Sequence, residues 1–132
     1  MNYLLDTHVL LWAINDETKL STKAKETLDN TENSVYVSAI SFWEISVKFS
    51  LGKLKLKGFT PDDLTELSIQ IGFKLLPLLH DECATYHHLI NTIHRDPFDR
   101  ILIWQAIKGN YTLITKDSKA SLYNTSGLKS IW

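Results

Sequence analysis

The chain has 132 residues, of which 44% are hydrophobic and 22% charged, and its formal net charge is −1. This composition is typical of a globular protein, argues against disorder and, taken alone, gives no sign of a nucleic-acid partner. No apolar run approaches the length of a membrane span, and the single cysteine, Cys83, excludes a disulfide framework, so we expect one cytoplasmic domain over residues 1–132 with no membrane partner.

Apolar periodicity and capping residues predict that strands and helices alternate along the chain. The expected strands cover residues 2–5, 34–38, 73–76, 111–115 and 128–132. The expected helices begin at residue 9 and after residue 21, and then cover residues 39–51, 60–72, 81–93 and 96–108. This alternation indicates an α/β fold with a parallel sheet, in which sites lie beyond the carboxyl ends of the strands. Acids that follow strands are therefore candidates for one shared site.

Two acids occupy such positions. Asp6 ends the first predicted strand, and Asp117 follows the strand that ends at Thr115. Asp6 is equally suited to a role as a helix cap, and for Asp117 a turn or cap role is the default. For Asp6 both roles are compatible, because a cap at a strand end already points into the crevice.

Glu44 falls inside an apolar stripe of the predicted helix 39–51, which contains Ile40, Trp43 and Val47. A carboxylate on a buried face is costly unless it is ion-paired, hydrogen-bonded or bound to a cation. A lysine or arginine partner remains open at this point, but the position favours a role in a site.

Asp96 and Asp99 lie at the start of the predicted helix 96–108, with Pro97 in its first turn. Asp96 is suited to cap this helix, and Asp99 is placed where an acid reaches back to the cap. Asp99 also borders the expected buried face. Taken alone, the pair is more typical of a cap than of a site.

Four acids from distant segments, Asp6, Glu44, Asp99 and Asp117, would repel one another if they converged. A divalent cation removes this conflict, and Mg²⁺ and Mn²⁺ prefer oxygen ligands. Such an ion supports hydrolysis of a phosphodiester bond. The acids therefore predict a metal-dependent enzyme that acts on phosphodiesters.

Other polar and aromatic residues carry weaker signals. Four lysines within ten residues form either a solvated helix end and loop or a phosphate-contacting patch: Lys48, Lys53, Lys55 and Lys57. The histidines, among them His94, lack zinc-site spacing and are expected at the surface or in packing. Trp12 and Trp104 lie in apolar helical patterns and are expected in the core or an interface rather than as base-stacking platforms.

Four segments, residues 4–12, 38–45, 94–103 and 113–117, together resemble PIN-domain proteins, and more closely the VapC-type toxins of bacterial toxin–antitoxin pairs. The resemblance implies a PIN-like three-layer fold, with a central parallel sheet of four to five short strands flanked by helices. It implies an endoribonuclease dependent on Mg²⁺ or Mn²⁺, whose ligands match Asp6, Glu44, Asp99 and Asp117. Thr7 and Thr115 match hydroxyl positions near these ligands, and Asp96 and Arg100 belong to the motif of one subgroup. The implied partners are an RNA substrate, an inhibitory antitoxin and a second copy of the chain in a homodimer.

Two other functions remain open from the sequence. In the first, the chain is a non-catalytic partner-binding module whose acids serve as helix caps. In the second, Asp6 carries phosphate with Thr115 and Lys116 nearby, although the sequence after Asp6 lacks the second acid that such phosphatases need. Stabilisation by Mg²⁺ or Mn²⁺ would argue against the first function, and acid-labile phosphate on Asp6 would support the second.

Overall fold

The computed structural model describes residues 1–90 and 93–132, which contain a five-stranded parallel sheet with the strand order β3-β2-β1-β4-β5. Its strands are β1 (Asn2–Leu5), β2 (Ser34–Ser38), β3 (Lys74–Leu76), β4 (Thr112–Ile114) and β5 (Lys129–Ile131). The chain builds outward from β1 to β3 and then returns to add β4 on the other side of β1. The strand order therefore reverses at β1, where parallel sheets open a crevice.

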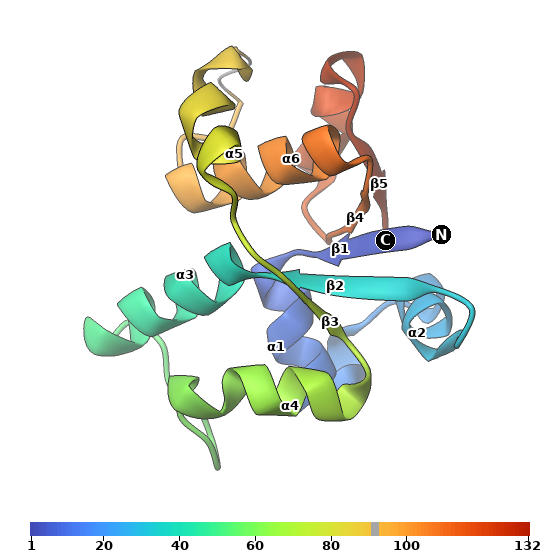
Figure 1. Cartoon of the computed structure of the whole chain (residues 1–132). Coiled ribbons are helices and arrows are strands. Elements are labelled where there is room, and N and C mark those ends of the chain that lie inside the picture. Colours follow the sequence, from blue (N-terminus) through green and yellow to red (C-terminus); the bar gives the residue numbers. More distant parts are fainter. Residues whose placement is uncertain (91–92) are drawn as a thin grey trace.

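Helices cover both faces of the sheet. They are α1 (Thr7–Asn15), α2 (Thr22–Asp29), α3 (Ala39–Ser50), α4 (Leu64–Ile71), α5 (His80–Thr85) and α6 (Pro97–Gly109), with the 3₁₀ helices η1 (Glu17–Lys19), η2 (Pro61–Asp63), η3 (Tyr86–His88) and η4 (Ser118–Ser126). Figure 1 shows α1 to α4 on one face, and α5, α6 and the segment between β4 and β5 on the other. In the described part of the chain, no helix combines the length and hydrophobicity needed to cross a bilayer.

Each face of the sheet has its own apolar core, because neighbouring strand residues point in opposite directions. Leu5 and Ile114 are buried against α1, α2 and α3, whereas Leu4 and Leu113 are buried against α6 and η4. The central strands are therefore apolar on both sides, as expected for a parallel sheet covered by helices. The predicted three-layer α/β fold is confirmed.

The main departure from the predicted elements lies before α6. The helix predicted over residues 81–93 ends as α5 at Thr85 and continues only as η3 to His88, while residues 91 and 92 lie outside the described residues. The carbonyl of Leu89 accepts a hydrogen bond from the Arg100 side chain rather than continuing a helix. The 3₁₀ helix η4 is also absent from the predicted elements, because its sequence has no helical periodicity of apolar residues.

The carboxyl ends of β1 and β4 lie side by side, because Leu5 is paired with Ile114. Asp6 continues this pairing, and its backbone N–H donates to the Ile114 carbonyl at 3.0 Å. Ser38, at the end of β2, accepts the Ile40 N–H at 3.1 Å and so starts α3. The ends of β1, β4 and β2 therefore bring Asp6 and α3, the helix that carries Glu44, to the same edge of the sheet.

Candidate active site

The hydroxyl of Thr115 connects Asp6 and Asp117 at the ends of adjacent strands. Thr115 Oγ1 donates to Asp6 Oδ2 at 2.6 Å and accepts a hydrogen bond from the Asp117 backbone N–H at 3.0 Å. Oδ1 of Asp6 accepts the His8 backbone N–H at 3.3 Å and thereby caps α1. Asp6 is therefore a helix cap, as the sequence allowed, and also lines a pocket with Thr115 and Asp117.

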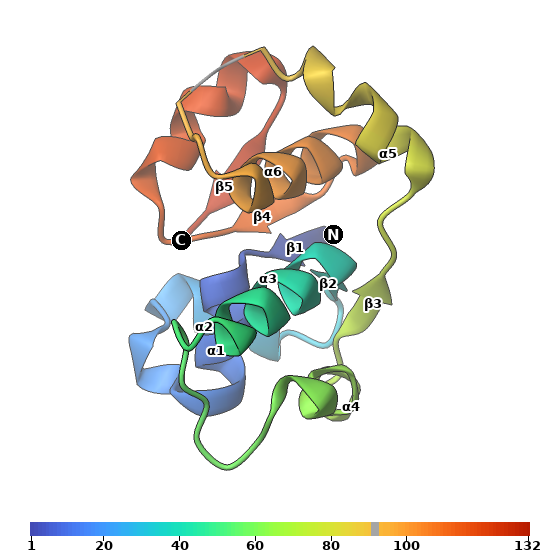
Figure 2. The same cartoon turned by 90° about the vertical axis from the view of Figure 1, so that its left-hand side faces the viewer.

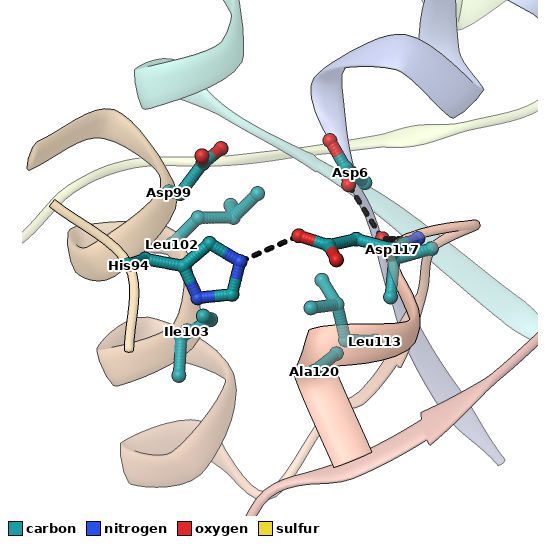
Figure 3. A pocket seen from close by; sticks show the side chains of 9 residues that line it. Asp6, His94, Asp99, Leu102, Ile103, Leu113, Asp117 and Ala120 are labelled. Atoms are coloured by element: carbon teal, nitrogen blue, oxygen red, sulfur yellow. Dashed lines mark hydrogen bonds and ion pairs between the residues drawn. The ribbon is translucent and has the colours of Figure 1, made fainter. Parts of the chain in front are cut away.

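His94 orients the Asp117 carboxylate from the opposite wall of this pocket. Its Nε2 atom lies 2.5 Å from Asp117 Oδ2, and Figure 3 shows the imidazole facing the carboxylate. On the other side of the ring, Nδ1 lies 3.1 Å from the hydroxyl of the fully buried Tyr123, and the two rings stack. With the proton on Nε2, Nδ1 accepts from the Tyr123 hydroxyl, which in turn accepts the His94 backbone N–H.

These contacts determine the charge state of Asp117. Burial alone raises its pKa, but hydrogen bonds from His94 and from the Lys119 backbone N–H outweigh burial and hold the pKa below its ordinary value. Oδ1 accepts the Lys119 N–H at 2.9 Å, so Asp117 also caps η4. At neutral pH the carboxylate is therefore ionised and held in one orientation.

Asp99 is the least satisfied acid of the pocket. It lies on the first turn of α6 and lines the same pocket as Asp6 and Asp117 (Figure 3). Burial, together with the negative charges of Asp96, Asp6 and Glu44, raises the pKa of Asp99 from 3.8 to about 6. Among the described residues none donates a hydrogen bond to its carboxylate, so Asp99 does not reach back to the helix cap.

Glu44 is buried on α3, as the apolar stripe predicted, with a side chain only 5% exposed. The partner left open by the sequence is Lys48, whose Nζ atom lies 2.5 Å from Glu44 Oε2. The hydrogen bond to Glu44 raises the pKa of Lys48, and the negative charges of Asp96 and Asp99 add to this effect. Lys48 thus faces the acids instead of belonging to a solvated lysine patch.

The remaining residues of the predicted site form hydrogen bonds that stabilise the elements around the pocket. The buried hydroxyl of Thr7 donates to Ser41 Oγ at 2.9 Å and links α1 to α3. Asp96 caps α6 by accepting the Phe98 N–H at 2.8 Å. The Arg100 guanidinium donates to the Tyr86 hydroxyl at 2.8 Å and to backbone carbonyls of the preceding segment, so it fastens that segment to α6.

The four predicted RNA-contact lysines have different surroundings in the structure. Lys48 pairs with Glu44, whereas Lys55 and Lys57 line a groove beside α1. Lys53 lies in the exposed turn after α3 and lines none of the described pockets that contain the acids or the other lysines. Contact of these lysines with RNA stays a prediction.

The sequence analysis missed two contributors to the site. His94 was expected at the surface or in packing, and Tyr123 was not singled out at all. The histidine lies within the segment that resembles the third acidic motif, which was the one signal available for it. Tyr123 gave no signal, because its contact with His94 spans 29 residues.

The donor chemistry of the four acids fits a divalent cation. Carboxylate oxygens are the ligands that Mg²⁺ and Mn²⁺ prefer, and a cation would relieve the repulsion that, together with burial, raises the pKa of Asp99. Within residues 1–90 and 93–132, however, no three His, Cys, Asp or Glu side chains are already arranged to hold one ion. Lys48 engages Oε2 of Glu44, and His94 engages Oδ2 of Asp117.

Comparisons with known proteins agree with this architecture. Residues 3–126 match the family model described as PIN domain. The chain is 24% identical over 129 residues to "Ribonuclease VapC22" of Mycobacterium tuberculosis (strain ATCC 25618 / H37Rv), across 98% of this chain and 97% of that protein. The match therefore extends over nearly the full length of both sequences.

Two solved structures have a similar fold. VapBC2 from Rickettsia felis, bound to a DNA fragment from its promoter, aligns with a TM-score of 0.67 and 19% identity, over 99% of this chain and 98% of that chain. FitAcB from Neisseria gonorrhoeae aligns with a TM-score of 0.66 and 22% identity, over 100% of this chain and 97% of that chain. At this identity, the likeness establishes a shared fold.

Proposed function

Because this chain belongs to the PIN domain family, we propose that it is a metal-dependent endoribonuclease and the toxin component of a toxin–antitoxin pair. The main support is the pocket at the carboxyl ends of β1 and β4. Acids from three distant segments, Asp6, Asp99 and Asp117, line it together, and burial and acidic neighbours raise the pKa of Asp99. The similar protein from Mycobacterium tuberculosis is named as a ribonuclease, which supports the proposed activity.

The proposed ligands of Mg²⁺ or Mn²⁺ are Asp6, Glu44, Asp99 and Asp117, either directly or through water. Asp99 is the most available metal ligand, since no described residue donates a hydrogen bond to its carboxylate. When bound, the ion would activate water for attack on the RNA phosphodiester and neutralise the charge that builds on the phosphate. This chemistry requires ionised carboxylates, and the contacts of Asp117 hold its pKa below the ordinary value.

The chain's own residues orient these acids. Thr115 fixes one oxygen of Asp6 through its hydroxyl, and His94 fixes one oxygen of Asp117. Lys48 neutralises Glu44 when no cation is bound. We infer that these three contacts hold the carboxylates of Asp6, Asp117 and Glu44 at the same edge of the sheet before substrate arrives.

The proposed partners are an RNA substrate, a cognate antitoxin and a second copy of the chain. The solved structures with a similar fold include toxin–antitoxin assemblies, VapBC2 and FitAcB, which supports the proposal of an antitoxin. Co-expression with a small DNA-binding protein encoded immediately upstream would test it. Co-purification of the two chains, and inhibition of cleavage by the second, are the expected results.

The decisive experiment is RNA cleavage by the purified chain. A panel of tRNAs and other single-stranded or looped RNAs is incubated with Mg²⁺ or Mn²⁺, and in parallel with EDTA. We expect cleavage with either ion and none in EDTA. Asp6→Asn and Asp99→Asn remove one negative charge each while preserving shape, and we expect each to reduce cleavage by at least about a hundredfold, the upper range for substitutions beside a metal.

A matched control uses an acid outside the pocket. Asp62 lies exposed in η2, so Asp62→Asn makes the same chemical change and should leave cleavage intact. Full cleavage by the Asp6 and Asp99 variants would contradict the assignment of the site. Absence of both cleavage and stabilisation by Mg²⁺ in a thermal scan would favour the non-catalytic module instead.

A further inference from the structure

A groove continues from the acids along α1. On the open side of the pocket, Asp6, Asp99 and Asp117 are joined by His8, Trp12 and Lys116. His8 and Trp12 also line the next hollow, together with Lys19 and the segment that contains Lys55 and Lys57. Because the two hollows share side chains, one surface leads from the acids to the lysines. We call the surface lined by His8, Trp12, Lys19, Lys55, Lys57 and Lys116 the α1 groove.

Trp12 is the centre of this groove. Part of its side chain packs against the core, as the sequence predicted, but the residue is only partly buried. The ring centroid of Trp132 lies 5.8 Å from that of Trp12, and Lys116 Nζ lies 5.8 Å from the Trp12 ring centroid. A partly exposed indole beside a cation is suited to stack a nucleobase.

The far wall of the groove carries exposed lysines. Figure 2 shows the segment between α3 and α4 as a long connection beneath α3. Within it, Leu54 and Leu56 pack against the core, and the alternating Lys55 and Lys57 are exposed. The two leucines therefore anchor the segment, and the two ammonium groups remain available to solvent or to phosphates.

The charge of the α1 groove is positive away from the acids. None of Lys19, Lys55 and Lys57 forms a salt bridge with a described residue. The one carboxylate that lines this hollow belongs to Asp16, which accepts hydrogen bonds from the backbone and side chain of Thr18 and so caps η1. The groove thus offers unpaired cations on one side and an aromatic ring on the other.

We propose that the α1 groove binds single-stranded RNA next to the cleaved bond, with one base stacked on Trp12 and backbone phosphates at Lys55 and Lys57. The identity of the strand as RNA rests on the proposed function, while the groove supplies the preference for an unpaired strand. In a duplex the base faces are already stacked, so an exposed indole has no base to receive. Stacking accepts any base, and the groove therefore does not demand a particular sequence.

Binding is tested on the full chain in EDTA, where cleavage is not expected. Fluorescence anisotropy follows a labelled single-stranded RNA octamer at several salt concentrations. We expect Lys55→Gln/Lys57→Gln to weaken binding about tenfold and to flatten the slope of log Kd against log salt by about 1.4, from about 0.7 per phosphate contact. Lys23→Gln/Lys129→Gln makes the same charge change at exposed sites outside the groove, and should bind within about twofold of wild type.

Trp12 is tested by a graded pair of substitutions. Trp12→Leu removes the aromatic face and should weaken octamer binding about tenfold, whereas Trp12→Phe retains a ring and should bind closer to wild type. Because Trp12 also packs on the core, thermal melting checks that each variant is folded. The lysine variants do not touch the core and decide the question if Trp12→Leu fails to fold.

The inference is overturned if the groove and control lysine variants bind alike, or if a duplex of the same sequence competes as well as the single strand. These results are separable from the proposed function. A chain that binds RNA through the groove but cleaves none with Mg²⁺ rejects the nuclease and keeps the groove. A chain that cleaves RNA, but whose groove variants all bind RNA like wild type, supports the nuclease and rejects the groove.

Discussion

The Nζ atom of Lys48 lies 2.5 Å from Oε2 of Glu44, one helical turn earlier in α3. The same ammonium group also feels the negative charges of Asp96 and Asp99. A cation supplied by the chain therefore offsets part of the repulsion among the acids. A divalent ion bound to Glu44 would share this carboxylate with the ammonium group, so we expect Lys48 and the ion to compete for it.

Substitution of Lys48 by methionine tests this competition. In EDTA, Lys48→Met leaves a buried carboxylate without its counter-ion, and we expect unfolding to require about 1–3 kcal/mol less, below the value for a fully buried pair because Lys48 is partly exposed. Mg²⁺ should stabilise this variant more than wild type, since the ion no longer competes with an ammonium group for Glu44. Urea unfolding with and without Mg²⁺ measures both effects. Lys25→Met, which breaks the exposed pair with Glu17, is the control and should respond to Mg²⁺ like wild type.

Asp99 makes stability depend on pH in the metal-free protein. Its pKa is about 6 in the folded chain against an ordinary value of 3.8, so the protonated form favours folding. This contribution is complete below about pH 3.8 and is lost as the pH rises through 6. Asp99→Asn should therefore be nearly neutral at pH 4 and stabilising by about 1–2 kcal/mol at pH 7.5, after allowance for solvent screening of a half-buried group.

Urea unfolding at both pH values in EDTA measures this effect. Asp62→Asn, at an exposed position, should show no such difference between the two pH values. Equal stability of Asp99→Asn and wild type at pH 7.5 would contradict the cost inferred for a charged Asp99 that is buried beside other acids. Saturating Mg²⁺ should reverse the order, because the substitution removes a proposed ligand.

His94 is expected to control the ionisation of Asp117. His94→Gln removes the imidazole hydrogen bond, which together with the Lys119 N–H outweighs the effect of burial. The pKa of Asp117 should therefore rise, and NMR titration of its carboxyl carbon measures the change directly. A lowered pKa gives stability that is present above the unfolded value and lost as pH falls through the folded one. The variant should accordingly lose more stability at pH 7 than at pH 3, and an unchanged Asp117 titration would exclude this role.

The fold was predictable because its signals are local. The apolar run of β1 and the serine cap of α2 are each contained within a few residues, and both predictions agree with the structure. Alternation of such elements is enough to indicate a parallel sheet. The end of α5 was not predictable from local sequence. The Leu89 carbonyl, just after η3, accepts a hydrogen bond from the side chain of Arg100, which is eleven residues further along the chain.

The site was predictable only in part, for the same physical reason. The burial of Glu44 follows from helical periodicity, and its spacing of four residues from Lys48 was a usable hint of the pair. By contrast, the Thr115 hydrogen bond to Asp6 spans 109 residues, and no local pattern predicts such a contact. The sequence can therefore nominate acids, while the orientation of each carboxylate depends on tertiary packing.

Arg100 provides the last prediction, because it fixes the segment that carries His94. Its guanidinium donates to the Tyr86 hydroxyl and to the carbonyls of Leu89 and His94, three acceptors that a lysine ammonium group is not shaped to satisfy together. Arg100→Lys should reduce the free energy of unfolding by about 1–3 kcal/mol and raise the pKa of Asp117 part of the way toward its value in His94→Gln.

The double variant separates this positioning role from a purely structural one. Arg100→Lys and His94→Gln both act on the contact between His94 and Asp117, so their effects on the Asp117 pKa should add to less than the sum of the single changes. Arg95→Lys makes the same replacement at an exposed neighbouring position and should leave the Asp117 titration unchanged. Strictly additive pKa changes would mean that Arg100 stabilises the fold without positioning His94.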